Sequence, residues 1–428
     1  MTVHAFVGPS CPASILLKHY PDVVRHGPVG HGDLFVGNIT AGDVVVIIDG
    51  VYHHRLALRH KEILDAMARG VTVVGAASIG ALRAAELSTF GMSGVGQIYQ
   101  WFCDGTFDGD DAVSVAHSES GDPTGINVPL VNLHAAMLAG CRAGVLREES
   151  ASRLLALLEQ EYYPLRSTER VLSIAEAGGE PAFASWYRAQ LRQDPFAFDQ
   201  KLADSLAALD FSTHVRPSET ATSLGVDFGR DWRTEYVSRW RQRFTMSSGT
   251  SMLHRLAYRQ IFDEDFPRTW WEYMQQYFRS MSPGTGDGLG HFVAHELGTT
   301  AREWIDDPIL RTRITTLICP VPDLGEPWQN DLLLRGETRH DRQVMSDWLR
   351  LTGEHLDRHP GRSLSHIPQS TCRHLLARIW NVEEDLLPEC GRRGFASLRQ
   401  AAEALRPFTI GYLSQVTEAA ASGAHADD

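Results

Sequence analysis

The segment Val71–Gly91 constrains the fold of this chain more than any other. It reads VTVVGAASIGALRAAELSTFG, so a β-branched run passes through small residues and a serine directly into a helix. Ser78 is therefore expected at a sharp turn between a parallel strand and a helix N-terminus. Ala76-x-Ser78-x-Gly80 is a loose version of the nucleophile elbow, with alanine in place of its first glycine. The backbone N–H groups after such a turn have no intrahelical acceptor and suit an anion.

Strands and helices alternate along the first 165 residues. The predicted strands are Val3–Val7, Asp33–Val36, Asp43–Ile48 and Val71–Val74, and the predicted helices run from Pro12 to about Tyr20, over His60–Arg69 and over Ala81–Thr89. This order predicts right-handed parallel crossovers and a Rossmann-like sheet. In such sheets ligands bind beyond the carboxyl ends of the strands. Gly8-Pro9-Ser10, Asp49-Gly50 and Ala76–Gly80 are such ends.

The later part of the chain has a different sequence pattern, because helical segments rich in arginine and aromatic residues replace the strands. The predicted helices are Glu180–Asp194, Phe196–Leu209, Trp232–Phe244, Met252–Phe262, Trp270–Met281, Asp341–Leu351, Leu375–Trp380 and Phe395–Leu405. We therefore expect an α/β domain over 1–165, a mainly α-helical domain over 166–417 and a flexible tail over 418–428. Breaks near 212–229 and 282–290 are possible further boundaries.

Composition excludes several classes of function. The formal net charge is −13, from 40 basic and 53 acidic residues, and no basic tract is present. A nucleic-acid partner is therefore not expected, because such binders carry a basic patch. The longest apolar runs fall far short of a membrane span, and the N-terminus has no pattern of a secretory signal. Six cysteines without a C-x-x-C pair favour a reduced, cytoplasmic protein.

A set of motifs between residues 43 and 120 is more specific than the sheet alone requires. They are IIDG ending at Gly50, HKEIL beginning at His60, S-x-G-A-L-R-A-A-E-L beginning at Ser78 and G-M-x-G-V-G beginning at Gly91. Asp104-Gly105, Asp110-Asp111 and Ala116-His117 complete the set. Together these motifs resemble the TfuA-like family. Phe6-Val7-Gly8-Pro9-Ser10 adds weaker support, and the helical half carries no matching motif.

The resemblance implies a role in peptide backbone thioamidation beside a YcaO enzyme. In such pathways the YcaO enzyme activates an amide of a precursor peptide with ATP, and sulfur replaces the carbonyl oxygen. The TfuA-like partner is implied to hydrolyse the thiocarboxylate of a ubiquitin-like sulfur carrier and so release sulfide. This chain has no G-x-x-x-x-G-K-[ST] motif, which agrees with a partner that leaves the ATP chemistry to YcaO. No cofactor and no metal is predicted.

This chemistry indicates roles for the residues of the matched region. A thiocarboxylate is an anion, so a site must neutralise its charge before it can stabilise an oxyanion. Arg83 and Lys61 are the available cations, and the N–H groups of Ile79 and Gly80 are possible oxyanion donors. Ser78 is either the nucleophile or a hydrogen-bonding group beside an attacking water. The possible bases are His60, His117 and Asp49, and the expected supporting residues are Glu62, Glu86, Asp110 and Asp111.

Each of these roles has a plainer structural alternative. Ser78 can serve only as a helix cap, and Arg83 and Glu86 can form an ordinary ion pair at i, i+3. Asp110 and Asp111 can mark a solvated turn.

Three cysteine and histidine patterns are weaker candidates. Cys11 at a helix start suggests a reactive thiol or persulfide. His291 and His295 suggest zinc, although the H-E-x-x-H order is missing. His355, His359, His366, Cys372 and His374 form a loose cluster of irregular spacing.

Two other functions compete with the sulfide-releasing enzyme. The first is a non-catalytic protein that docks on YcaO and activates it or presents the peptide. The second is a general serine hydrolase built on Ser78.

Overall fold

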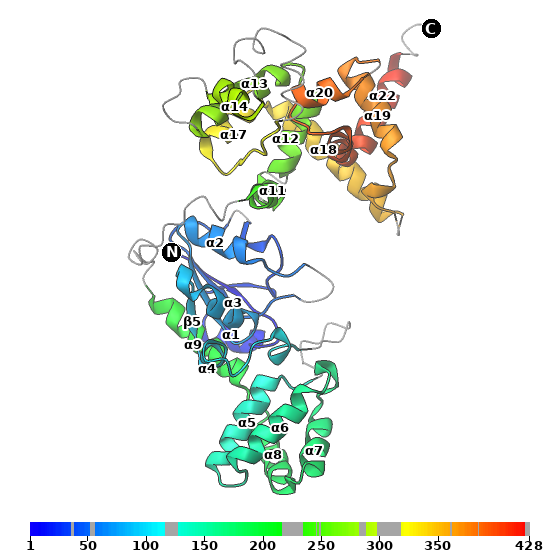
Figure 1. Ribbon diagram of the computed structural model, residues 1–428. Helices are drawn as coiled ribbons and strands as arrows, with labels where there is room; N and C mark the ends of the chain where they lie inside the picture. Colours follow the sequence, from blue (N-terminus) through cyan, green and yellow to red (C-terminus); the bar gives the residue numbers. More distant parts are fainter. Residues whose placement is uncertain are drawn as a thin grey trace. The chain divides into compact units, whose positions relative to one another are not determined.

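The computed structural model describes most of the chain. The described residues are 1–35, 38–51, 56–115, 127–215, 234–244, 246–247, 250–281, 288–297, 318–359, 362–383 and 385–423. The chain divides into two compact units, Met1–Trp232 and Arg233–Asp428 (Figure 1). The first unit extends past residue 165, the position at which the sequence pattern changes from alternating strands and helices to helices. In the part of the chain that the structure covers, no helix is both long enough and apolar enough to cross a membrane.

A five-stranded, all-parallel sheet forms the centre of the first unit, as predicted. Its strand order is β2-β1-β3-β4-β5. The strands are β1 (Val3–Phe6), β2 (Val24–His26), β3 (Val44–Ile47), β4 (Thr72–Ala76) and β5 (Ser93–Val95). β1, β3 and most of β4 are buried, which is why their sequences are mainly apolar and do not alternate between apolar and polar residues. The predicted α/β class with a Rossmann-like parallel sheet is confirmed.

Helices cover both faces of this sheet, and alternate strand residues separate the two layers. Val45 and Ile47 of β3 pack in one core with helices α2 (His60–Ala68) and α3 (Ile79–Leu87). Val44 and Val46 pack in another core with α1 (Ala13–His19) and α9 (Gln200–His214). The part of the chain after residue 165 therefore completes the sheet domain, because α9 forms half of one of its two layers.

Two glycines allow helix α3 to begin almost on the backbone of the sheet. A Cβ at Gly80 would lie 1.8 Å from the carbonyl oxygen of Ile47, and a Cβ at Gly75 would lie 2.0 Å from the carbonyl oxygen of Gly80. No side chain fits in either place. The strand–turn–helix unit seen in the sequence is therefore held tightly against β3.

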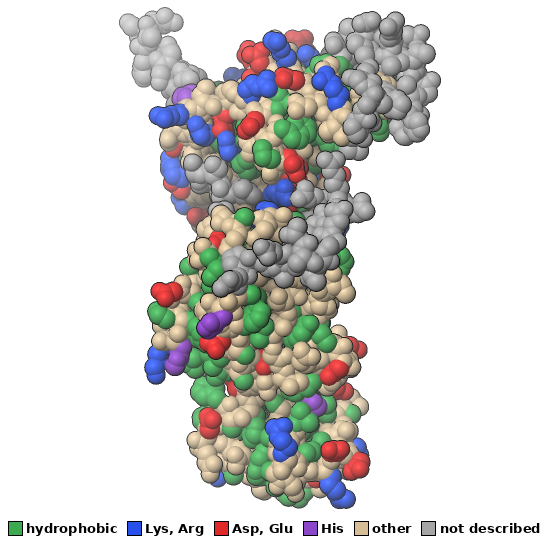
Figure 2. All heavy atoms as spheres, turned by 90° about the vertical axis from the view of Figure 1, so that its left-hand side faces the viewer, with side chains coloured by type: hydrophobic (Ala, Val, Ile, Leu, Met, Phe, Trp, Pro, Cys, Tyr) green, Lys and Arg blue, Asp and Glu red, His purple; other side chains and the backbone are tan. Residues whose placement is uncertain are grey.

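The remaining helices of the first unit extend from the sheet. They are α4 (Gln97–Cys103), α5 (Leu130–Arg142), α6 (Glu148–Glu159), α7 (Thr168–Ala177) and α8 (Pro181–Gln193). α5 to α8 form a helical group beside the sheet (Figure 1), and they share one apolar core with α4. On the face shown in Figure 2, acidic and basic side chains are interspersed over this unit.

In its described residues, the second unit is helical apart from the short strands β6 (Met246–Ser247) and β7 (Thr250–Ser251). Its helices are α11 (Glu235–Phe244), α12 (Met252–Phe262), α13 (Phe266–Met281), α14 (Gly288–Leu297), α17 (Pro327–Leu333), α18 (Arg339–Asp357), α19 (Gln369–Trp380), α20 (Leu387–Arg392), α21 (Leu398–Leu405) and α22 (Thr409–Gly423). The predicted helix Met252–Phe262 has these same bounds in the structure. α22 continues to Gly423, within the segment expected to be a tail.

One predicted strand is wrong. Asp33–Val36 was expected to be a short strand, but Asp33–Phe35 forms a 3-10 helix. The Asp33 carboxylate accepts a hydrogen bond of 2.7 Å from the Gly30 N–H, and Arg69 donates one of 2.6 Å to the Leu34 carbonyl. The first bond is local and the second comes from helix α2's C-cap residue, and together they hold the segment in a conformation other than a strand.

Candidate functional site

The turn between β4 and α3 has a strained backbone. Ala77 has a φ of 64°, a left-handed conformation that residues with a Cβ rarely adopt. The Ser78 N–H donates to the Ala76 carbonyl at 2.7 Å, which closes a three-residue turn around Ala77. Such turns cost energy and persist where the surrounding structure enforces them, often at functional sites. The elbow-like turn expected from the sequence is present.

Ser78 is the N-cap residue of α3, but its side chain does not cap the helix. The residue is 3% exposed, and its hydroxyl makes no hydrogen bond with any residue that the structure describes. The plain structural alternative for this serine, a helix cap, is therefore not realised. An almost buried hydroxyl without a partner at a strand end is available for a ligand.

The two backbone groups predicted as oxyanion donors differ from each other. The Gly80 N–H points at the sheet and donates to the Ile48 carbonyl at 3.3 Å. Ile79 is the first residue of α3, where an N–H has no intrahelical acceptor. Of the two, Ile79 is the donor that is better placed for an anion.

Asp49 lies at the end of β3 and binds the loop that follows β1. Its carboxylate accepts hydrogen bonds from the N–H groups of Gly8 at 2.8 Å and Ser10 at 3.0 Å. The Ser10 hydroxyl donates a third bond of 2.6 Å. Asp49 is 2% exposed, so these bonds replace the water that it loses. The structure brings together two of the three strand ends that the sequence singled out.

Lys201, the second residue of α9, lies against Asp49 and was missed by sequence reasoning. Its Nζ lies 3.9 Å from Asp49 Oδ1, and both side chains are 3% exposed. The ammonium also donates to the Val113 carbonyl at 2.7 Å. Burial lowers the pKa of Lys201, while the Asp49 and Asp199 carboxylates oppose that shift. One available signal was the spacing of Lys201, Ser205, Ala208 and Ser212, which places a lysine on the buried face of a helix.

His60, Arg83 and Glu86 form a second cluster, between helices α2 and α3. His60 Nε2 lies 2.8 Å from Glu86 Oε2, and Arg83 Nη1 contacts both Glu86 and His60 Nε2. His60 and Glu86 are 45% and 38% exposed, whereas Arg83 is 16% exposed. The buried Nε of Arg83 has no hydrogen-bond partner within the described chain. Arg83 thus forms the ion pair with Glu86, and its buried Nε is a donor without a described partner.

Glu62 and Lys61 lie at the start of α2. The buried Glu62 carboxylate accepts bonds of 2.6 Å from His31 Nδ1 and the Gly32 N–H, and one of 3.1 Å from the Arg59 N–H. Burial raises the pKa of Glu62, and these hydrogen bonds oppose the shift. Glu62 therefore anchors the loop before Asp33 to the helix. Lys61, the residue before Glu62 in the same helix, is half-buried.

The two neighbouring aspartates have structural contacts. Asp111 Oδ2 accepts a bond of 3.0 Å from Arg166, a guanidinium that is 1% exposed. The Asp110 carbonyl accepts a bond of 2.8 Å from the Ser114 hydroxyl. Both aspartates belong to a 3-10 helix, Asp110–Ala112, that fixes the segment before α5.

Several other candidates are separate from this site or lie outside the described residues. His117 lies outside them, and so do the side chains of His291 and His295. Cys11 is fully buried, and burial together with the Asp49 charge raises the pKa of its thiol to about 11. The expected lowering of this pKa at a helix start is therefore wrong. Among the described residues, no group of three or more histidine, cysteine or acidic side chains is arranged to hold a metal ion.

A parallel sheet between two helical layers, with polar loops gathered at the carboxyl ends of its strands, defines an α/β protein of the class whose ligands bind at the strand ends. Residues 49–167 match the family described as TfuA-like protein, so this part of the chain is TfuA-like. The match confirms the resemblance predicted from the motifs, and it begins at Asp49 itself. It supports a role in the YcaO-associated thioamidation system. No curated protein matches the chain.

Proposed function

We propose that the first unit hydrolyses the thiocarboxylate of a ubiquitin-like sulfur carrier and supplies sulfide to a YcaO enzyme that thioamidates a precursor peptide. The observation that carries the proposal is the Ser78 hydroxyl. It is nearly buried, it lies after a strained turn, and it forms no cap on α3. A strained turn costs energy, and such strain is typically kept where it positions a group for a ligand. This favours a ligand-binding role for Ser78 over a purely structural one.

The reaction is a hydrolysis that balances with water alone. An oxygen nucleophile attacks the thiocarboxylate carbon and forms a C–O bond, the C–S bond breaks, and sulfur leaves as hydrosulfide. With Ser78 as nucleophile, water then releases the carrier carboxylate from the serine ester. With water as nucleophile, Ser78 holds the reacting group by a hydrogen bond. Both routes leave the same products.

Charge neutralisation is the first requirement of this chemistry, because the substrate carbon resists attack while the thiocarboxylate keeps its full charge. The Ile79 N–H at the start of α3 supplies a donor with a partial positive charge. Arg83 lies one turn further along the helix with a free Nε. We assign both to the substrate anion, with Lys61 as a further cation from α2.

Two described side chains, Asp49 and His60, are candidates for the base of the reaction, and both already have hydrogen-bond partners. Asp49 is hydrogen-bonded to Gly8 and Ser10, and His60 is paired with Glu86. His60 Nε2 donates to Glu86 when protonated and accepts from Arg83 when not, so this imidazole can exchange a proton without moving. We therefore assign proton transfer to His60 and the organisation of the strand ends to Asp49, with Lys201 behind it.

The test is sulfide release from a purified carrier that bears a C-terminal thiocarboxylate. We expect the chain alone to release sulfide and leave the carrier with a carboxylate, seen by intact mass. The control is the same carrier with an ordinary carboxylate. If no sulfide appears above background, the catalytic proposal fails.

A second function is favoured by one observation, namely that no described side chain accepts a hydrogen bond from the Ser78 hydroxyl, so none of the described bases activates it directly. In that case the chain acts on YcaO by docking. The amount of thioamidated peptide formed by YcaO from added sulfide would then rise with the chain present. A sulfide-supplying enzyme has no such effect when sulfide is already in excess.

A further inference from the structure

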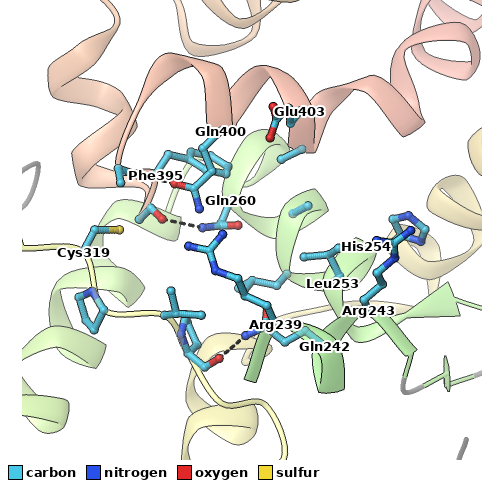
Figure 3. Close-up of a pocket in the computed structure, with 18 of the residues that line it drawn as sticks. Arg239, Gln242, Arg243, Leu253, His254, Gln260, Cys319, Phe395, Gln400 and Glu403 are labelled. Atoms are coloured by element: carbon cyan, nitrogen blue, oxygen red, sulfur yellow. Dashed lines mark hydrogen bonds between the residues drawn. The ribbon is translucent and has the colours of Figure 1, made fainter. Parts of the chain in front are cut away.

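The second unit contains a pocket of about 460 Å³ that the sulfide chemistry does not use. Its walls come from α11, α12, the segment 319–322 and the region around α21 (Figure 3). The volume lies within the usual range for small-molecule sites. Every lining residue belongs to the second unit, so the pocket is complete without the sheet domain.

The lining is mostly apolar, with a few polar groups. Trp240, Phe395 and the prolines at 320, 322 and 407 provide aromatic and aliphatic surface. The polar groups include Gln260 and Gln242, but their amides are already bonded to the carbonyls of Arg393 and Pro322. Such a lining favours a ligand with a large apolar body rather than a sugar-like one.

The ionisable groups of the pocket give it a positive charge. Burial and the neighbouring Arg243 lower the pKa of His254, and burial raises the pKa of Cys319 to about 12, so both are neutral near pH 7. Glu403 is balanced by Arg399 at 2.9 Å. Arg239 is paired with Glu235.

Arg243 is the exception among these charges. It stacks on Phe244, and its guanidinium has no carboxylate partner among the described residues. Figure 3 shows Arg243 beside His254, while Arg239 extends toward the middle of the pocket below Gln260. Arg239 and Arg243 carry two positive charges, and Glu235 neutralises one of them. One positive charge, that of Arg243, is therefore left for a ligand.

We propose that this pocket binds an organic anion whose apolar body fills the cavity and whose charged group pairs with Arg243. The site is independent of the sulfide-releasing function, because it uses no residue of the sheet domain. Carboxylate, sulfonate and phosphate groups all satisfy an arginine, and the shared chemistry is one anionic group on an aromatic or aliphatic body.

Two dyes with the same aromatic rings test the proposal. 8-Anilinonaphthalene-1-sulfonate carries a negative charge, and N-phenyl-1-naphthylamine is its neutral counterpart. The full-length chain is titrated with each dye by fluorescence, in the wild type and in three variants. They are Arg243→Gln, Ala396→Trp at the exposed rim of the pocket, and Arg373→Gln, an exposed arginine of α19 outside the lining.

We expect saturable binding of the sulfonate dye that Arg243→Gln weakens about tenfold or more, because a charge-assisted hydrogen bond is lost. The neutral dye should bind Arg243→Gln within about twofold of the wild type, since its rings keep their contacts. Ala396→Trp should weaken both dyes, and Arg373→Gln neither. Absence of sulfonate-dye binding, equal affinity of Arg243→Gln for that dye, or unchanged binding of both dyes to Ala396→Trp would each overturn the proposal.

Discussion

Lys201 Nζ lies 3.9 Å from Asp49 Oδ1, with both side chains 3% exposed. The pair joins a helix of the later chain to the residue at which the TfuA-like match begins. Buried opposite charges are retained only where hydrogen bonds satisfy them, and here Ser10, Gly8 and the Val113 carbonyl supply those bonds. The polar contacts at the strand ends therefore include α9, although α9 lies beyond the matched residues.

Removing the ammonium should leave the Asp49 carboxylate buried without its cation. We expect Lys201→Met to lower the free energy of unfolding of the first unit by about 3 kcal/mol in urea titrations. The double variant Asp49→Asn/Lys201→Met should recover part of this loss, because no charge then remains buried. Lys18→Met, at an exposed position of α1, is the control and should change stability little. Equal stability of Lys201→Met and Lys18→Met would show that the pair is not coupled.

The contact between α3 and β3 leaves no room for a methyl group at Gly80. Gly80→Ala places a Cβ against the Ile47 carbonyl, so we expect a loss of about 2–4 kcal/mol in stability as α3 is pushed away. Gly27→Ala is the matched control, since no atom lies within 4 Å of a Cβ there. Thermal unfolding of both variants compares them directly. A Gly80→Ala protein as stable as Gly27→Ala contradicts the close packing described here.

Acid should destabilise the first unit through its partly buried histidines. Burial lowers the pKa of His134, whose ring meets the edges of Trp101 and Phe107. Below pH 6.5 the unfolded chain takes up a proton that the folded imidazole resists, so stability falls as pH drops toward the lowered pKa. His134→Phe removes this titration.

Urea unfolding at pH 7.5 and 5.5 measures the effect. The loss of stability between the two pH values should be smaller in His134→Phe than in the wild type. An identical loss would mean that His134 does not contribute. His19→Phe, on an exposed residue of α1, serves as the control.

Native thiol labelling should separate the cysteines by burial. With a thiol pKa of about 11, Cys11 is a thiolate in roughly one molecule in a thousand at pH 8, and it is also inaccessible. Cys390 is buried as well, and burial raises its pKa to about 12. We therefore expect iodoacetamide to modify the exposed Cys103 first, as read by peptide mass. Early labelling of Cys11 would restore it as a reactive thiol.

The sheet and its strand ends could be predicted from local sequence, because buried parallel strands are continuous β-branched runs bounded by small residues. Asp33–Val36 has a similar composition, but Asp33 bonds to the nearby Gly30 N–H and the distant Arg69 bonds to the Leu34 carbonyl. No local pattern predicts the contact with Arg69. The Ser78 turn was predictable since each of its residues is adjacent in sequence.

The partners of the site residues were less predictable. Ser10, Asp49 and Lys201 come from three distant segments and meet only once α9 packs on the sheet. The pairing of Arg83 with Glu86 followed from helical spacing, whereas the addition of His60 depended on the packing of α2 beside α3.

The catalytic role of Ser78 is tested most directly by the single-turnover rate of sulfide release by Ser78→Ala, compared with the wild type. The substitution removes one oxygen that has no described partner, so folding should be preserved, and circular dichroism checks this. We expect a fall of about a hundredfold or more, because Ser78 meets the reacting group. A folded Ser78→Ala protein that releases sulfide at the wild-type rate would contradict this role.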